Sequence, residues 1–154
     1  MLLPIQGRAG KESHLKYYFY VLIFAMTLAG CKESIKHDEV LAGKQAEEFA
    51  RITFVKQDMD SGYALLADAT KRHVSRDQFK VVVLKLHPNG FPKTVAAFEY
   101  KPMPLGEKAI YVSLKGENSG EHFNYEFTME GTATTGYRVL KFSRSSGRPL
   151  SSSN

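Results

Sequence analysis

The spacing of the apolar residues changes once along this chain, and that change limits the folds that the chain can adopt. Between residues 38 and 87 apolar side chains recur every three or four positions, as in Phe79 and Val83, which is the period of an α-helix. After residue 93 they alternate, as in Ile110, Val112 and Leu114, which is the period of a β-strand. The sequence therefore predicts an α+β domain in which the helices precede the strands.

Two helices are expected before residue 70. The first covers residues 38–56 in about five turns, and its core-facing positions are Ala42, Ala46, Phe49, Ile52 or Thr53, and Lys56. It should break around Asp58, because Asp60-Ser61-Gly62 favours a turn and the Asp60 side chain can cap the helix that follows. That second helix is short and contains Tyr63, Leu65, Leu66 and Ala67.

A third helix is expected after residue 74. Ser75-Arg76-Asp77-Gln78 has the form of a capping box, in which the Ser and Gln side chains satisfy backbone groups at the start of a helix. The stripe behind it consists of Phe79, Val82, Val83 and Leu86, and Pro88-Asn89-Gly90 ends the helix. The β-branched run Val81-Val82-Val83 favours a strand instead, so the helix is the preferred of two interpretations.

Four strands are expected over residues 94–101, 107–115, 121–130 and 137–144. The connections between them are short, so consecutive strands should pair as an antiparallel meander. Its apolar face needs a cover, and the three helices are the cover available. The predicted fold is about three N-terminal helices packed on a curved, cone-like sheet of four antiparallel strands, with Phe127 on the covered face and Thr128 on the opposite one.

Composition and charge are those of an ordinary globular protein. The 154 residues suit one domain, expected over residues 38–144 and followed by a serine-rich disordered tail at 145–154. The formal charge is +5, but three of the 21 basic residues and one of the 16 acidic residues lie in the first 30, so the remainder carries +3. Basic and acidic residues alternate along most of that remainder, which argues against nucleic-acid binding.

The first 30 residues have the organisation of an export signal. Arg8, Lys11 and Lys16 precede the almost wholly apolar run 17–29. As a helix this run would extend about 20 Å, which is short of the roughly 30 Å hydrocarbon core of a bilayer. A helix of the core should show one polar face, and this run shows none. A cleaved signal peptide over residues 1–30 is therefore the favoured interpretation.

Leu28-Ala29-Gly30-Cys31 resembles the lipobox of bacterial lipoproteins. The resemblance implies cleavage between Gly30 and Cys31, a diacylglycerol on the Cys31 thiol, usually a further acyl chain on its amino group, and a tether over residues 31–37. Two or three chains make such anchoring durable. The other interpretation is a buried cysteine after an uncleaved anchor. By the sorting pattern of enterobacterial lipoproteins, Lys32 would direct the protein to the outer membrane, facing the periplasm, in a host with two membranes.

The order of elements over residues 38–144 resembles the nuclear-transport-factor-two-like superfamily, in which a bent sheet wraps a long helix. Ser75-Arg76-Asp77-Gln78-Phe79 and Gly136-Tyr137-Arg138-Val139 are similar to segments of small bacterial domains of this kind, many of them lipoproteins. That superfamily usually has more strands than are found here, so a truncated or cystatin-like variant is an equal alternative.

The sequence shows no convergent set of catalytic residues. His73 lies in a polar connector, His87 is expected as a cation at a helix end, and His122 should point away from the helices. No pair of residues has the spacing of a zinc site, and Asp58 and Asp60 suit helix caps. No cofactor is predicted, and the protein is not expected to be an enzyme.

The aromatic residues offer one candidate site. Core packing is the favoured role of the aromatic side chains. The alternative is that they line an apolar pocket in a cone, with phenol groups at its mouth, and the candidates for that mouth are Tyr63, Tyr111, Tyr125 and Tyr137. The leading hypothesis is a non-catalytic binding or interaction domain that is held on the envelope membrane through Cys31 and has a protein partner there. The alternatives are a small-molecule-binding or hydrolytic cone with a degenerate site, and an inhibitor or immunity-type protein.

Overall fold

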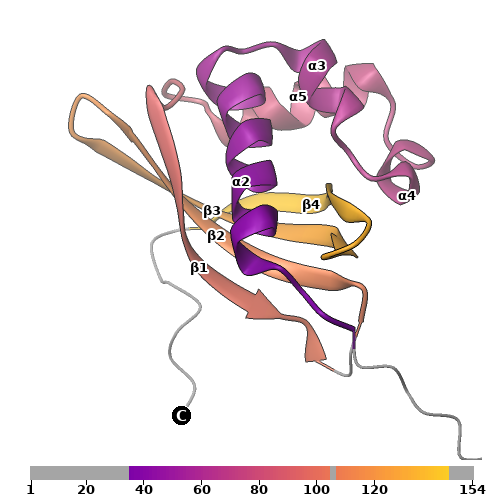
Figure 1. The fold of residues 1–154 in the computed structure, drawn as a ribbon. Coiled ribbons are helices and arrows are strands. Elements are labelled where there is room, and N and C mark those ends of the chain that lie inside the picture. The colour runs from indigo at the N-terminus through magenta and orange to yellow at the C-terminus, as the bar shows by residue number, and fades with distance from the viewer. Residues whose placement is uncertain (1–34, 105–106, 146–154) are drawn as a thin grey trace, which may run out of the picture. The chain divides into compact units, whose positions relative to one another are not determined.

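The computed structural model describes residues 35–104 and 107–145, and Figure 1 shows their fold. The helical elements are α2 (Glu39–Ala50), the π-helical turn η1 (Arg51–Val55), α3 (Met59–Ala64), α4 (Asp68–Lys71) and α5 (Arg76–Leu86). The strands are β1 (Thr94–Pro102), β2 (Ala109–Asn118), β3 (Glu121–Thr132) and β4 (Gly136–Ser145). The predicted α+β class and the order of helices before strands are confirmed.

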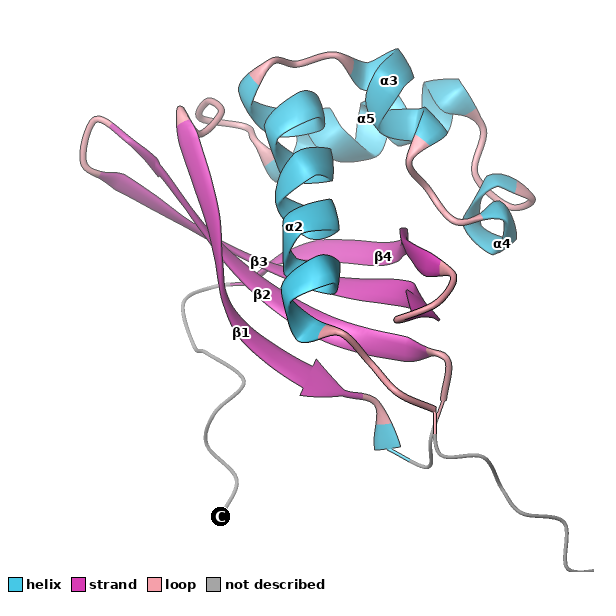
Figure 2. Cartoon of the chain, viewed as in Figure 1, coloured by secondary structure: helices cyan, strands magenta, loops and turns pink. Residues whose placement is uncertain are grey.

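The four strands form one antiparallel sheet in the order β1-β2-β3-β4, which confirms the predicted meander. Figure 2 shows the sheet bending around α2, which lies across one of its faces. Phe127 pairs with Val112 on β2 and with Phe142 on β4, and its side chain is buried. Thr128 is next to it on the other face and is partly exposed. The predicted register of β3 is therefore confirmed.

The first helix extends through residue 55, as expected, but its last turn is wider than an α-helix. The N–H of Lys56 donates to the carbonyl of Arg51, five residues back. In a regular α-helix residues five apart differ by about 140° around the axis, whereas the π-turn brings Phe54 to the side of Phe49, with ring centroids 5.8 Å apart. Phe54 is buried and Lys56 is exposed, so the expected core position of Lys56 is wrong.

The cap of α3 is Asp58 and not Asp60. The Asp58 carboxylate accepts a hydrogen bond of 3.0 Å from the N–H of Ser61, and that bond lowers the pKa of Asp58. Asp60 instead lies 3.6 Å from both Arg76 and Lys80. The expected turn at Asp60 is wrong, because α3 has already begun at Met59.

The second helix ends earlier than expected and is followed by two features that the sequence did not reveal. α3 stops at Ala64, and Leu66 forms an isolated parallel bridge with Val139 on β4. The short helix α4 then occupies part of the segment that was expected to be a polar connector. This segment therefore covers part of the exposed edge of β4.

The capping box of the third helix is confirmed. The N–H of Gln78 donates to Ser75 Oγ over 3.3 Å, and Gln78 Oε1 accepts from the N–H of Ser75 over 2.8 Å. The helix buries Phe79 and Val83, but Val82 is exposed, although it was expected in the core stripe. The β-branched run thus lies in a helix, which buries Val83 and leaves Val81 and Val82 exposed.

The core between the helices and the sheet is built mainly of aromatic rings. Phe49 and Phe54 come from the first helix, and Phe49 makes ring contacts with both Phe79 of α5 and Phe127 of β3. Phe123, Tyr125 and Tyr137 also belong to this cluster, and Phe142 packs against it. The interior of the cone is therefore occupied by the protein's own side chains.

In the part of the chain that the structure describes, no helix has both the length and the apolar character needed to span a bilayer.

Candidate functional site

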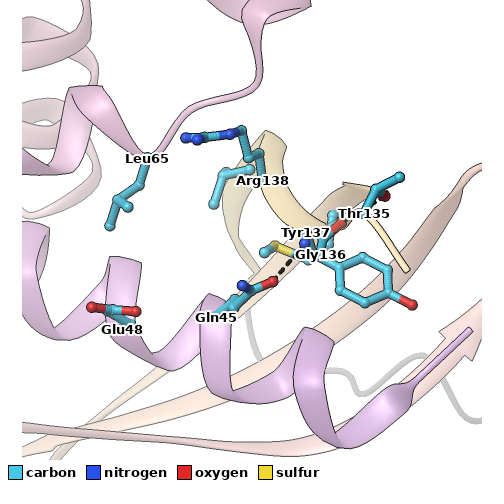
Figure 3. A pocket seen from close by; sticks show the side chains of 9 residues that line it. Gln45, Glu48, Leu65, Thr135, Gly136, Tyr137 and Arg138 are labelled. Carbon is cyan, nitrogen blue, oxygen red and sulfur yellow. Dashed lines mark hydrogen bonds between the residues drawn. The ribbon is translucent and has the colours of Figure 1, made fainter. Parts of the chain in front are cut away.

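A small pocket of about 160 Å³ lies between α2 and the start of β4 (Figure 3). Its apolar lining comes from Leu65, Met129 and Val139. Its polar and charged lining comes from Gln45 and Glu48 on α2, and from Thr135, Gly136, Tyr137 and Arg138 around the turn into β4.

The pocket is held by hydrogen bonds between segments that are far apart in the sequence. Gln45 Oε1 accepts a bond of 2.5 Å from the N–H of Tyr137, drawn as a dashed line in Figure 3. Arg138 donates to the carbonyl of Ala64 over 3.2 Å, and Val139 exchanges backbone bonds with Leu65 and Ala67. These bonds fix β4 against both α2 and the segment after α3.

The turn into β4 requires glycine at two positions. Gly136 has a φ of +70°, which a residue with a side chain rarely adopts. Gly131 has a φ of +144°, and a Cβ added there would collide with the carbonyl group of Gly136. The sequence Gly131 to Gly136 therefore determines the close approach of the strands that shapes one wall of the pocket.

The two charged residues of the pocket have opposite signs. Glu48 belongs to α2 and Arg138 to β4, and both are exposed. Together with the Gln45 amide, they could contact a small polar molecule that carries both charges and rests on the apolar lining. The pocket therefore suits binding, since it offers charges and hydrogen-bonding groups at the surface of the domain.

A second polar arrangement is buried under α5. His87 Nδ1 lies 2.8 Å from the carbonyl oxygen of Val83, and His87 Nε2 lies 2.8 Å from the Tyr125 hydroxyl. The imidazole ring also stacks on Phe91 at 4.5 Å between centroids. The simplest proton arrangement has Nδ1–H donating to Val83 and Nε2 accepting from the Tyr125 hydroxyl.

Burial keeps both members of this pair neutral. It lowers the pKa of His87, although the hydrogen bond to Val83 opposes that shift, and it raises the pKa of Tyr125 well above its ordinary value. The expectation that His87 is a cation at a helix end is therefore wrong, because the side chain turns into the core and lies 4% exposed. Nδ1 bonds within the last turn of α5, and Nε2 joins that helix end to β3.

The four candidate tyrosines are not brought together. Tyr63 donates to the carbonyl of Val74 over 2.9 Å, and Tyr125 is buried beside His87. Tyr111 lies on the opposite face of the sheet from its buried neighbours Ile110 and Val112. Tyr137 lines the α2–β4 pocket, but its hydroxyl accepts from the N–H of Asp38 over 2.8 Å and lies 3.2 Å from His37 Nδ1.

The remaining histidines occupy exposed positions. His122 lies 3.6 Å from Glu117 at the surface, so its expected orientation away from the helices is confirmed. His73 is exposed next to Val74. Within residues 35–104 and 107–145, no three His, Cys, Asp or Glu side chains are grouped in a way that could hold a metal ion. Gly30 and Cys31 lie outside the described residues.

The pocket residues Gln45, Glu48 and Arg138 were missed by sequence reasoning. No local pattern connects them, because about 90 positions separate α2 from β4 along the chain. The Gly131-to-Gly136 turn was recognisable, but the partner that it would meet was not.

No protein-family model matches the chain, and no characterised protein or solved structure shows significant similarity to it.

Proposed function

We propose that this chain is a bacterial lipoprotein that is anchored to an envelope membrane through lipid on Cys31 and presents a non-catalytic interaction domain. The support for the anchor is the sequence: the charged N-terminal segment, the apolar run 17–29 and the lipobox-like Leu28-Ala29-Gly30-Cys31. The tether over residues 31–37 would hold the domain close to the bilayer. In a host with two membranes, Lys32 would direct the protein to the outer membrane.

The observation that carries an interaction role is the occupied interior of the cone. In the superfamily that the chain resembles, the enzymes use polar groups inside the cone. Here rings such as Phe49, Phe54 and Phe127 occupy that position, and the buried polar groups of His87 and Tyr125 bind each other. Contacts with other molecules are therefore expected at the surface of the domain.

The anchor is tested by replacing the cysteine. Cys31→Ser should abolish labelling by radioactive palmitate and leave the precursor uncut, because the thiol is the group that accepts the lipid. A matched control places a cysteine three residues further on, as Cys31→Ser with Ser34→Cys, and should also remain unlabelled. Labelling of either variant would contradict the assignment of Cys31.

The α2–β4 pocket favours a second candidate, the binding of a small molecule. Its opposite charges, Glu48 and Arg138, suit a zwitterion such as a free amino acid. Titration of the chain with L-leucine should shift the amide NMR signals of Gly136 and Val139, and Arg138→Ala should remove the shift. L-leucine amide, which lacks the carboxylate, is the matched control ligand. Equal shifts with both ligands would exclude a role for Arg138 in recognising a carboxylate.

A further inference from the structure

The outer surface of α5 carries three exposed apolar side chains among its charged residues. Val81, Val82 and Leu84 are 48%, 43% and 56% exposed, and they are three of the five large hydrophobic side chains that are exposed in the described part of the chain. Residues three and four apart lie on one side of a helix, so Leu84 extends the surface that begins with Asp77 and Val81. The helix leaves this surface uncovered after burying Phe79 and Val83 on its other side.

A shallow groove of about 490 Å³ runs beside the same surface. It is lined by His73, Val74, Asp77, Gln78, Val81 and Val82. Leu84 is one turn further along the helix and does not belong to the groove. α5 thus carries the projecting apolar side chain of Leu84. About six residues before Leu84, it also borders a groove of the kind that receives such a side chain in paired helices.

The charges around this surface are arranged in a self-complementary way. Arg76 and Lys80 are both engaged with Asp60 of the same chain. Asp77 near the start of α5 and Lys85 near its end form no ion pair within the described residues. Eight residues separate them, which is about 12 Å along a helix.

We propose that α5 is a dimerisation helix and that it packs antiparallel on α5 of a second copy of this chain, with the two-fold axis at Val81. In that pairing Leu84 of each copy meets the groove of the other next to Gln78. Asp77 of each copy meets Lys85 of the other. One arrangement thus covers the apolar surface, fills both grooves and pairs all four charges.

A second copy fits these features better than a lipid surface does. An anionic bilayer would attract Lys85 but leave Asp77 without a partner, whereas an antiparallel helix pair places each Asp77 against a Lys85. The contact is isologous, as two-fold dimers require, because the same patch serves both copies. The surface is small, so the dimer is weak in solution, and confinement on a membrane would strengthen it by raising the effective concentration. Only that last effect rests on the proposed anchor.

Cross-linking tests the predicted contact directly. Full-length chains, one population labelled with ¹⁵N and the other unlabelled, are mixed in detergent and treated with a carbodiimide, which joins a carboxylate to an amine with loss of water. We expect a covalent dimer in which mass spectrometry finds Asp77 of one isotope joined to Lys85 of the other. A link within one chain cannot form, since the two residues are about 12 Å apart on a rigid helix. A cross-linked dimer that lacks this link would overturn the proposal.

Charge reversal provides the second test, with sedimentation velocity as the measurement. Asp77→Lys and Lys85→Asp should each weaken association about tenfold, because each replaces two attractive contacts with repulsive ones. The double variant should restore it. Lys141→Asp, an exposed change on β4, should leave association unchanged. Leu84→Ser should also weaken the dimer and does not depend on how well the charge variants fold. A chain that remains monomeric at all concentrations, or a double variant that is not restored, would overturn the proposal.

Discussion

The two longest helices of this domain are used in opposite ways. α2 buries one broad face, which includes Ala42, Ala46, Phe49 and Ala50. α5 has nearly the same length but buries only Phe79 and Val83, and it leaves three large apolar side chains exposed. The difference indicates that α2 organises the fold, whereas α5 completes the core and presents a surface.

α2 also contacts both edges of the sheet. Gln45 accepts from the N–H of Tyr137 on β4, and Glu47 accepts from the N–H of Ala97 on β1 over 2.7 Å. Both edge strands therefore curve towards the same helix. Occupied edge N–H groups are less able to pair with the strands of other molecules, so these two contacts protect part of each sheet edge.

The largest effect is expected where α2 meets the sheet. Phe127→Ala removes a buried ring that lies 5.6 Å from Phe49 and should cost about 3 to 5 kcal/mol of unfolding free energy. Thr128→Ala, on the opposite face of the same strand, should cost well under about 1 kcal/mol. Denaturant midpoints measure both values. If Thr128→Ala were the more damaging change, the register of β3 would have to be reassigned.

A smaller effect is expected where α5 is joined to the sheet through its buried polar pair. Tyr125→Phe keeps the ring but leaves His87 Nε2 without its hydrogen-bond partner, which should cost about 1 to 3 kcal/mol. Tyr111→Phe, on the outer face of the sheet, is the control and should change stability little. Thermal unfolding distinguishes them. Equal stability of the two variants would mean that the pair contributes nothing to holding α5.

The hydrogen bond between Glu47 and the edge of β1 should contribute less to the free energy of unfolding than the His87–Tyr125 pair. Glu47→Ala removes the acceptor for the N–H of Ala97, and a hydrogen bond of this kind contributes about 1 kcal/mol. Glu48→Ala, the next residue on α2, is exposed and serves as the control. Amide hydrogen exchange at Ala97 should accelerate in the first variant only. Unchanged exchange there would show that the Glu47 contact does not protect the strand edge.

Stability should also depend on pH through His87. Burial lowers the pKa of His87 below its ordinary value of 6.5, so the unfolded chain binds this proton more readily than the folded one. The contribution of neutral His87 to the free energy of unfolding is fully present above pH 6.5. It is lost as the pH falls from 6.5 through the lower pKa that His87 has in the folded state. Replacing His87 with Asn should remove this part of the decline, whereas His122→Asn should retain it. Unfolding curves between pH 5 and 8 provide the measurement, and identical profiles for wild type and His87→Asn would contradict it.

The smallest effect on folding is expected on the outer side of α5. Leu84→Ser should change the unfolding free energy by less than about 0.5 kcal/mol, because the side chain is already largely in solvent. Val83→Ala, the neighbouring buried position, should cost more. Chemical denaturation at low protein concentration, where the dimer is absent, compares the two. A large loss in Leu84→Ser would mean that this side chain supports the fold of one chain.

Local patterns in the sequence were sufficient for much of the fold. The alternation in Phe123, Tyr125 and Phe127 predicted the register of β3, and Ser75 with Gln78 predicted the start of α5. These predictions succeed because the partners lie within a few residues of one another, so their spacing alone determines which groups meet. The lipobox prediction at Cys31 is also local and stays a prediction.

The tertiary structure decided what depends on distant partners. His87 is neutral and buried because Val83, Phe91 and Tyr125 enclose it, and Tyr125 is 38 residues away. The pocket exists because Gln45 meets Tyr137, and Phe54 enters the core because the helix widens into a π-turn. In each case the sequence supplies the chemical group, but its burial, and so its charge or its availability, is determined by which remote segment packs against it.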